Sequence, residues 1–319
     1  MNSRQDIEIE NYALFTGVNE SILKLNPFIS KLGFEFIYLN ASKLEKGYKK
    51  LFNAPQVCVS QRSVKFSSGV IVSREFYDSF NAQPFVKFGA NGLFLLKKNT
   101  TYFQKVENGL VQINVAAMVE TQDFALKLER TLRLFKNGDV FVPILFEIET
   151  DSRNICSKYD TGFSSNNPTS IYDIQNNEAR KLNELLLQEN NPTVLTELAE
   201  KYFFGSYYLN NASERIVNLM TALESIFNRN PNQISHVIAR HLSLIISSDK
   251  EEFSVNYARI KKLYTIRSKI VHGQSTIPQS EQGNIVSELQ NITRQAILYC
   301  LNSNMNKDEL FSYLNCKGF

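Results

Sequence analysis

The spacing of apolar residues divides the chain into two parts with different periods. Between about Gly33 and Thr150, short apolar runs rich in β-branched and aromatic residues alternate with polar turns, which is the pattern of β-strands. We expect strands at Phe34–Leu39, Val57–Val59, Val70–Val72, Phe85–Phe88, Leu93–Leu96, Tyr102–Val106, Leu110–Val115 and Val140–Ile148. The first half of the sequence therefore predicts a β-rich domain.

Three Asn-Gly pairs indicate that these strands are antiparallel. The pairs are Asn91-Gly92, Asn108-Gly109 and Asn137-Gly138. Each lies between apolar stretches, and this dipeptide supplies the positive φ angles that two-residue hairpin turns require. Two segments, Glu20–Lys31 and Gln122–Arg133, suit helices instead. The second is ambiguous, because Thr131–Phe135 also suits a hairpin arm that leads into Asn137-Gly138.

The second half of the chain has the period of helices. From Asp151 to Asn177 the sequence turns polar and contains the run Ser164–Pro168, so we expect a linker or long surface loop over residues 151–177. The helices expected beyond it are Glu178–Glu189, Val194–Leu209, Arg215–Phe227, Gln233–Ile246, Phe253–Val271, Gly283–Leu301 and Asp308–Leu314. The sequence thus predicts an α+β fold class, with an N-terminal antiparallel β-rich domain over residues 1–150 and an all-α helical bundle over residues 178–319.

Composition and charge exclude several classes of function. The 35 Lys and Arg against 32 Asp and Glu leave a net charge of +3 in 319 residues, which gives no bulk argument for a nucleic-acid coat or a membrane-surface protein. Four cysteines without a CxxC pair argue against a zinc ribbon or a disulfide framework and favour a reducing compartment. No stretch reaches the roughly 20 apolar residues that span a bilayer, and the N-terminus lacks a signal-peptide core. We therefore expect a cytoplasmic protein with no membrane contact.

The sequence also lacks the signatures of several enzyme classes. No GxxxxGK[ST], strand-linked GxGxxG, HExxH or GxSxG pattern occurs, which removes the motifs of P-loop, Rossmann, zincin and α/β-hydrolase chemistry. We expect no cofactor and no metal, so any chemistry must come from ordinary side chains.

One arginine lies where the helical period expects an apolar residue. At about 100° per residue, Arg267 falls near the middle of the apolar stripe of the helix expected at Phe253–Val271. That stripe consists of Ile260, Leu263, Tyr264, Ile270 and Val271. A guanidinium cannot lose its charge, so its desolvation must be offset by a carboxylate, carbonyls, a dimer partner or an anionic ligand.

A histidine follows this arginine near the end of the same helix. His272 comes five residues after Arg267 and directly before Gly273, a natural helix-terminating residue. In an ideal helix this spacing separates the two side chains by about 140°. They converge only if the last turn unwinds or if two copies of the segment face each other, and the second option implies a dimer.

The charges around this pair predict a local anion site. From Phe253 to Ser280 there is no Asp or Glu, while five cations are present: Arg259, Lys261, Lys262, Arg267 and Lys269. A histidine that titrates near neutrality can move protons to and from the 2′-oxygen or the leaving 5′-oxygen of RNA, and a guanidinium can stabilise the charge that gathers on the phosphate. This is the minimal equipment for metal-free RNA cleavage.

At these residues the sequence resembles a known family. The segment Ile266–Gly273 (IRSKIVHG) is similar to the Arg-x4-His motif of HEPN domains, the higher-eukaryote and prokaryote nucleotide-binding domains, and resembles their Apea-like branch in particular. Upstream, Ala222–Phe227 is similar to the ALE-x-L-F helix of that branch, and Leu263-Tyr264 also fits. The resemblance covers roughly Val194–Leu301.

The resemblance implies a helical domain that dimerises, so that two motifs form one composite cleft, and that commonly acts as a metal-independent endoribonuclease in toxin–antitoxin and antiphage systems. It assigns Arg267 to phosphate binding and the transition state, His272 to acid–base chemistry, and Glu224 to orienting or neutralising Arg267. Many nuclease members have Asn, Asp or His after the arginine, where this chain has Ser268 as a supporting polar residue. The tyrosine that marks the subtype paired with nucleotidyltransferase antitoxins is absent at position 274.

Plainer interpretations stand beside each of these assignments. Arg267 and Glu224 could form only a structural ion pair, His272 could interact only with the carbonyl end of the helix dipole, and the basic run could be a solvated helix face. His236 and His241 are left out of the catalytic set, since His241 shares an apolar face and suits a packed position.

The sequence therefore supports several functions. The first is a HEPN-type endoribonuclease that acts on RNA as a homodimer, with Arg259, Lys261, Lys262 and Lys269 as RNA-binding residues. The alternatives are a non-catalytic RNA- or nucleotide-binding dimer and an interaction scaffold. The β-rich half could regulate the helical half by binding a trigger ligand or an antitoxin.

Overall fold

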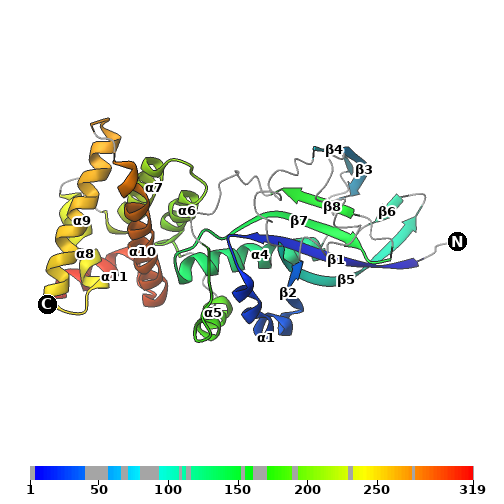
Figure 1. Ribbon diagram of the computed structural model, residues 1–319, viewed down its shortest axis with the longest axis horizontal. Helices are drawn as coiled ribbons and strands as arrows, with labels where there is room; N and C mark the ends of the chain where they lie inside the picture. Colours follow the sequence, from blue (N-terminus) through cyan, green and yellow to red (C-terminus); the bar gives the residue numbers. More distant parts are fainter. Residues whose placement is uncertain are drawn as a thin grey trace. The chain divides into compact units, whose positions relative to one another are not determined.

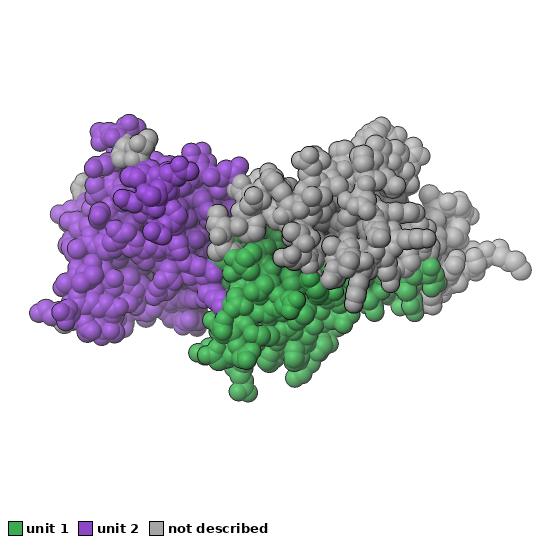
Figure 2. Space-filling view, in the orientation of Figure 1, with its two compact units in different colours: residues 1–129, 138–184 green, residues 130–137, 185–319 purple. Residues whose placement is uncertain are grey.

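The computed structural model describes residues 4–39, 57–65, 71–79, 93–107, 110–112, 116–151, 155–160, 171–188, 193–228, 233–274 and 277–318 (Figure 1). The chain forms two compact units, coloured separately in Figure 2. The first comprises residues 1–129 and 138–184, and the second comprises residues 130–137 and 185–319. The fold is α+β, with the strands in the first unit and most of the helices in the second.

An antiparallel sheet organises the first unit. Its strands are β1 (Arg4–Thr16), β2 (Phe34–Leu39), β5 (Leu93–Glu107), β6 (Leu110–Gln112), β7 (Phe141–Glu149) and β8 (Ile155–Asp160). Their order is β2-β5-β1-β7-β8, and β6 pairs with β5. A separate hairpin pairs β3 (Val57–Lys65) with β4 (Ile71–Ser79). Every pairing between these described strands is antiparallel.

Both faces of this sheet are buried: Ala13 and Phe15 of β1 are buried on one face and the residues that alternate with them on the other. Tyr12 and Leu14 of β1 point to the same side because strand side chains alternate, and both are buried. Tyr12 stacks on Phe146 of β7 with 5.0 Å between ring centroids. The core cluster comprises Tyr12, Leu14, Leu95, Ile144, Phe146 and Ile148. Strand β1 thus lies in the middle of the sheet and supplies its core, although the sequence did not lead us to expect it.

Helical segments of the first unit differ in part from expectation. The stretch expected as one helix at Glu20–Lys31 is instead three short turns: η1 (Glu20–Leu25), α1 (Asn26–Ile29) and η2 (Ser30–Leu32). The ambiguous segment at Gln122–Arg133 is helical, within α4 (Ala116–Phe135). Residues 130–137, which include the last turn of α4, belong to the second unit.

The three Asn-Gly pairs, expected at hairpin turns, have different outcomes. Asn137-Gly138 follows α4 and leads into β7, so it connects a helix to a strand and is no hairpin turn. A Cβ on Gly138 would collide with the ring of Tyr172, which explains why glycine occupies this position. Asn108-Gly109 lies outside the described residues, but the flanking Glu107 and Leu110 pair across β5 and β6, as a two-residue hairpin requires. Asn91-Gly92 and the strand expected at Phe85–Phe88 also lie outside the described residues.

The segment expected as a linker over residues 151–177 carries part of the sheet. It contains β8, which pairs with β7 from Ile144 to Ile148. Further on, Tyr172 is buried and its backbone N–H donates to the carbonyl of Gly17 over 2.7 Å. The first unit therefore extends beyond residue 150, and the division between the units falls inside α5 (Glu178–Leu187), between Glu184 and Leu185.

The second unit consists of helices whose first and last residues lie within four residues of the positions expected from the sequence. They are α6 (Glu197–Ser206), α7 (Ala212–Phe227), α8 (Ile234–Ile246), α9 (Lys250–Val271), α10 (Gln279–Ser303) and α11 (Lys307–Cys316). The apolar face predicted for α7 is buried over Ile216, Leu219, Met220, Leu223, Ile226 and Phe227. Helix α9 packs against α7 and α8, and α10 packs against α6, α7 and α8. Within the described residues, no helix is long and apolar enough to cross a bilayer.

Candidate functional site

Helix α9 positions the residues that the sequence singled out. It begins at the N-cap Asp249, whose carboxylate accepts hydrogen bonds from the backbone N–H groups of Glu251 and Glu252. It ends where Gly273 adopts a φ of 68°, a left-handed conformation that favours glycine. Only Ile260 and Leu263 of this helix are fully buried, so most of its length is accessible to a ligand.

Arg267 pairs with Glu224 of α7. One Nη2 atom of Arg267 lies 3.2 Å from Oε2 of Glu224, and their side chains are 22% and 17% exposed. Nε of Arg267 and Oε1 of Glu224 are buried and make no hydrogen bond to a described residue. The pair is thus joined by a single contact, and Nε of Arg267 retains unused hydrogen-bonding capacity.

Tyr264 completes the surroundings of this ion pair. The guanidinium carbon of Arg267 lies 5.9 Å from the centroid of the Tyr264 ring. Burial raises the pKa of the Tyr264 hydroxyl, and the nearby Glu224 carboxylate raises it further. Tyr264 therefore remains protonated at neutral pH and can act as a hydrogen-bond donor beside Glu224.

His272 lies on the surface, on another side of the helix. It is the C-cap residue of α9 and is exposed. Its backbone N–H donates to the carbonyl of Ser268 over 3.1 Å, so the last turn keeps its helical bond. The separation of about 140° between Arg267 and His272 is therefore retained. The structure does not show the last turn of α9 unwound. Convergence of the two side chains would therefore require a second copy of the chain.

Arg259 is engaged by an acid from another helix. Its Nε lies 2.7 Å from Oε1 of Glu288 on α10, and its Nη2 also bonds Oε2 of the same carboxylate. This hydrogen bonding raises the pKa of the Arg259 guanidinium. The absence of acids in the sequence window 253–280 therefore does not leave its arginines unpaired, because Glu224 and Glu288 approach from neighbouring helices. Sequence spacing alone does not reveal such partners.

The three lysines of the window are exposed and point in two directions. At about 100° per residue, Lys262 and Lys269 lie about 20° apart on one side of α9. Lys261 lies about 100° away from Lys262, in the same narrow sector as Ser268 and His272. The structure therefore does not bring all predicted RNA-binding residues to one surface.

The two histidines of α8 occupy contrasting positions. His241 is buried, with its Nε2 atom 3.0 Å from Oδ1 of Asn315 and its ring edge-on to Phe311. Burial lowers the pKa of His241, so its imidazole is neutral. His236 is exposed and its Nδ1 lies 2.7 Å from the Tyr257 hydroxyl. Sequence reasoning missed this second contact, because nothing in the spacing of the two residues indicates that α8 and α9 meet there.

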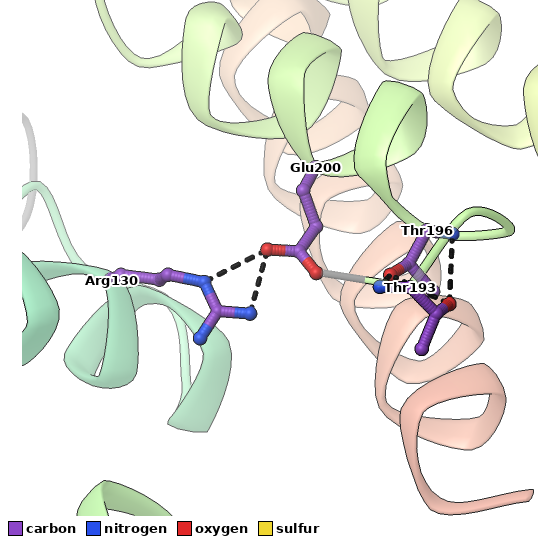
Figure 3. A network of polar contacts seen from close by, with 4 residues as sticks. All are labelled: Arg130, Thr193, Thr196 and Glu200. Carbon is purple, nitrogen blue, oxygen red and sulfur yellow. Dashed lines mark hydrogen bonds and ion pairs between the residues drawn. The ribbon is translucent and has the colours of Figure 1, made fainter. Parts of the chain in front are cut away.

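A further polar cluster lies between the last part of α4 and the start of α6 (Figure 3). Nε and Nη2 of Arg130 lie 2.8 and 2.7 Å from Oε2 of the buried Glu200. Burial raises the pKa of Glu200, and Arg130 opposes this effect. Thr193 and Thr196 bond each other at the beginning of α6. The position of this cluster between packed helices suits a structural role.

The described residues give little support for a metal site or for a nucleophilic cysteine. No three His, Cys, Asp or Glu side chains gather as metal ligands would in the described part of the chain. Burial raises the pKa of Cys300 to about 12, which keeps this thiol protonated at neutral pH and unsuited to nucleophilic attack.

Comparisons with known proteins do not identify the chain. No family model matches it, and neither a curated protein nor a solved structure is significantly similar.

Proposed function

We propose that the chain is a metal-independent endoribonuclease of the Apea-like HEPN type that acts as a homodimer. The observation that carries the proposal is the end of α9, where the exposed His272 follows the half-buried Arg267 in a segment without acids. The resemblance of Ile266–Gly273 to the Arg-x4-His motif supports the same reading. A proton-transfer group and a fixed cation are what cleavage at the 2′-hydroxyl requires.

The proposed reaction uses the RNA itself as nucleophile. His272 accepts the proton of a 2′-hydroxyl, whose oxygen attacks the adjacent phosphorus. The bond from phosphorus to the 5′-oxygen breaks, the leaving oxygen takes a proton from water, and His272 then releases its proton to solvent. The products are a 2′,3′-cyclic phosphate and a 5′-hydroxyl. Arg267 stabilises the charge on the phosphate oxygens.

The angle between Arg267 and His272 on α9 determines how an active site would be assembled. Because Arg267 and His272 point about 140° apart, one chain alone does not present both groups to one phosphate. In a two-fold symmetric dimer, Arg267 of one protomer can approach His272 of its partner, and the symmetry then creates two equivalent sites. Glu224 would hold Arg267 until RNA binds, since their single contact leaves the guanidinium with free donors.

The first unit has a proposed role in regulation. Its antiparallel sheet would bind a trigger ligand or an antitoxin and so control a nuclease that otherwise damages its own cell. A role as a cytoplasmic toxin or antiphage effector follows from the family resemblance.

A second candidate is a non-catalytic RNA-binding dimer. The ion pair between Arg267 and Glu224 favours it, because an arginine neutralised within its own chain can serve the packing of α7 against α9 alone. In that case His272 acts only as an exposed polar residue near the carbonyl end of α9.

Cleavage of RNA in the presence of EDTA tests the proposal. The full chain should cut single-stranded RNA without metal, and Arg267→Ala or His272→Ala should each lower the rate at least about a hundredfold. Gln274→Ala is the matched control, because Gln274 is exposed two residues beyond His272. Salt-sensitive RNA binding without cleavage would leave the second candidate, and an absence of RNA binding would contradict both.

A further inference from the structure

A group of side chains on α8 and α9 lies outside the Arg267–Glu224 pair. The Nδ1 atom of His236 lies 2.7 Å from the Tyr257 hydroxyl, and their rings are edge-to-face with centroids 5.8 Å apart. Nζ of Lys261 lies 5.7 Å from the centroid of the Tyr257 ring. Phe253 also stacks on Tyr257, with 6.1 Å between ring centroids. His236 and Lys261 are exposed, and Tyr257 is half-buried.

The charge around this group favours an anion. From Ser225 to Ser248, which includes all of α8, the sequence contains no Asp or Glu, and the same is true from Phe253 to Ser280. Glu252, at the start of α9, accepts hydrogen bonds from the backbone and hydroxyl of Ser248. Glu288 is occupied by Arg259, which lies about 160° around α9 from Lys261. The remaining acid of the two helices, Glu251, lies in the first turn of α9, about 120° around the helix from Tyr257.

The group is aligned with His272 along one side of α9. At about 100° per residue, Tyr257, Lys261, Ser268 and His272 fall within a sector of about 60°. Lys261 precedes His272 by eleven residues, which is about 17 Å along the helix. Lys262 and Lys269 lie outside this sector. The helix thus offers a phosphate-binding cation and an acid–base group on the same side, at a separation that one RNA strand can span.

We propose that His236, Tyr257 and Lys261 bind a phosphodiester of the RNA strand and direct that strand along α9 toward His272. When the Tyr257 hydroxyl donates to Nδ1, His236 carries its proton on Nε2, which can then donate to a phosphate oxygen. Lys261 supplies the positive charge. This inference rests on the proposed action on RNA and specifies the path of the strand.

Binding of a short RNA to lysine variants tests the proposed path. In a His272→Ala background, which prevents cleavage, a fluorescent 12-nucleotide single-stranded RNA is titrated at several salt concentrations in EDTA. Lys261→Ala should weaken binding several-fold and lower the slope of log K against log salt by about 0.7, the value for one lost phosphate contact. Lys261→Arg should restore the slope, because it restores the charge. Tyr257→Phe should weaken binding about twofold to threefold, since it frees His236.

Lys201→Ala is the control. It removes the same charge from an exposed position on another helix, α6, so both affinity and slope should stay within about twofold of the parent. Equal effects of Lys261→Ala and Lys201→Ala would overturn the inference, as would no effect of either.

Cleavage by the chain with His272 intact separates this inference from the proposed function. If Lys261→Ala weakens binding specifically but the chain with His272 intact does not cleave RNA, the proposed path of the RNA strand along α9 (the strand path) is supported and the proposed nuclease activity is contradicted. Cleavage with equal effects of the two lysine variants overturns the strand path and leaves the nuclease. No RNA binding overturns the strand path, and circular dichroism of each variant checks that the helices are intact.

Discussion

Arg267 shows how far single residues can be interpreted from sequence. Its place on an apolar stripe predicted a partner, and the structure provides Glu224 at 3.2 Å. Arg259, by contrast, was expected to contribute to an anion site and instead bonds Glu288 with two nitrogens. The difference is physical: helical period predicts that a side chain points inward, but it does not predict which distant helix supplies the neighbouring acid.

His241 gives a prediction about pH at the same scale. The pKa of this buried imidazole is lowered first by burial, and the charges of Arg240 and His236 lower it further, while the hydrogen bond to Asn315 opposes them. The unfolded chain, with a pKa near 6.5, therefore binds more protons than the folded chain in mildly acidic solution. The free energy of unfolding should fall as pH drops below 6.5, by up to about 1.4 kcal/mol per pH unit.

Urea unfolding between pH 5 and pH 8 measures this effect. His241→Gln, which can keep a hydrogen bond to Asn315, should remove most of the acid-dependent loss of stability. His236→Gln makes the same change at an exposed position of α8. With this control, the free energy of unfolding should still fall at acid pH nearly as much as in the wild type. A wild-type pH dependence that survives His241→Gln would show that another group is responsible.

Secondary-structure elements were predictable to different degrees. The helices of the second unit have a clear period, α7, α9 and α11 begin at side-chain N-caps, and α7 buries the face that its period predicts. Strand β1 was missed, although Ile7 and Ile9 alternate with Glu8 and Glu10 as a strand requires. Strand β8 was missed because the segment around it is polar. Both errors arise because pairing with a neighbouring strand outweighs local composition.

The last turn of α4 is fixed by α10 through one buried arginine. Nε of Arg294 donates to the carbonyl of Arg133 over 2.8 Å, and the guanidinium also bonds the amide oxygens of Asn137 and Asn291. Arg294 is 3% exposed. Its planar group satisfies acceptors in several directions, including a carbonyl of the last turn of α4.

Replacing Arg294 should therefore destabilise the second unit strongly. We expect Arg294→Ala to lower the free energy of unfolding by about 3 kcal/mol, and Arg294→Lys to recover only a minor part because an ammonium cannot reach all three acceptors. Urea unfolding followed by circular dichroism measures the loss. Asn291→Ala, which removes one of the three bonds, should cost about 1 kcal/mol. A loss for Arg294→Ala as small as that for Asn291→Ala would contradict this account.

At the scale of the whole molecule, the sequence predicted a strand-rich part followed by helices, and the structure shows an antiparallel sheet unit and a helical unit. The division between them was placed too early, because the segment expected as a linker contributes β8. The contact between Arg267 and Glu224 was predictable from the sequence. The cooperation of Arg267 with His272 stays a prediction, because their separation of about 140° on one helix would require a second copy of the chain.

Mixing two inactive variants tests the central claim most directly. If each site combines Arg267 of one protomer with His272 of its partner, random pairing of Arg267→Ala and His272→Ala chains gives mixed dimers with one intact site. About a quarter of the wild-type sites, and a similar share of the metal-independent cleavage rate, should then return. If both groups act within one chain, or if the motif is structural, the mixture stays as inactive as either variant alone, and that result would contradict the account.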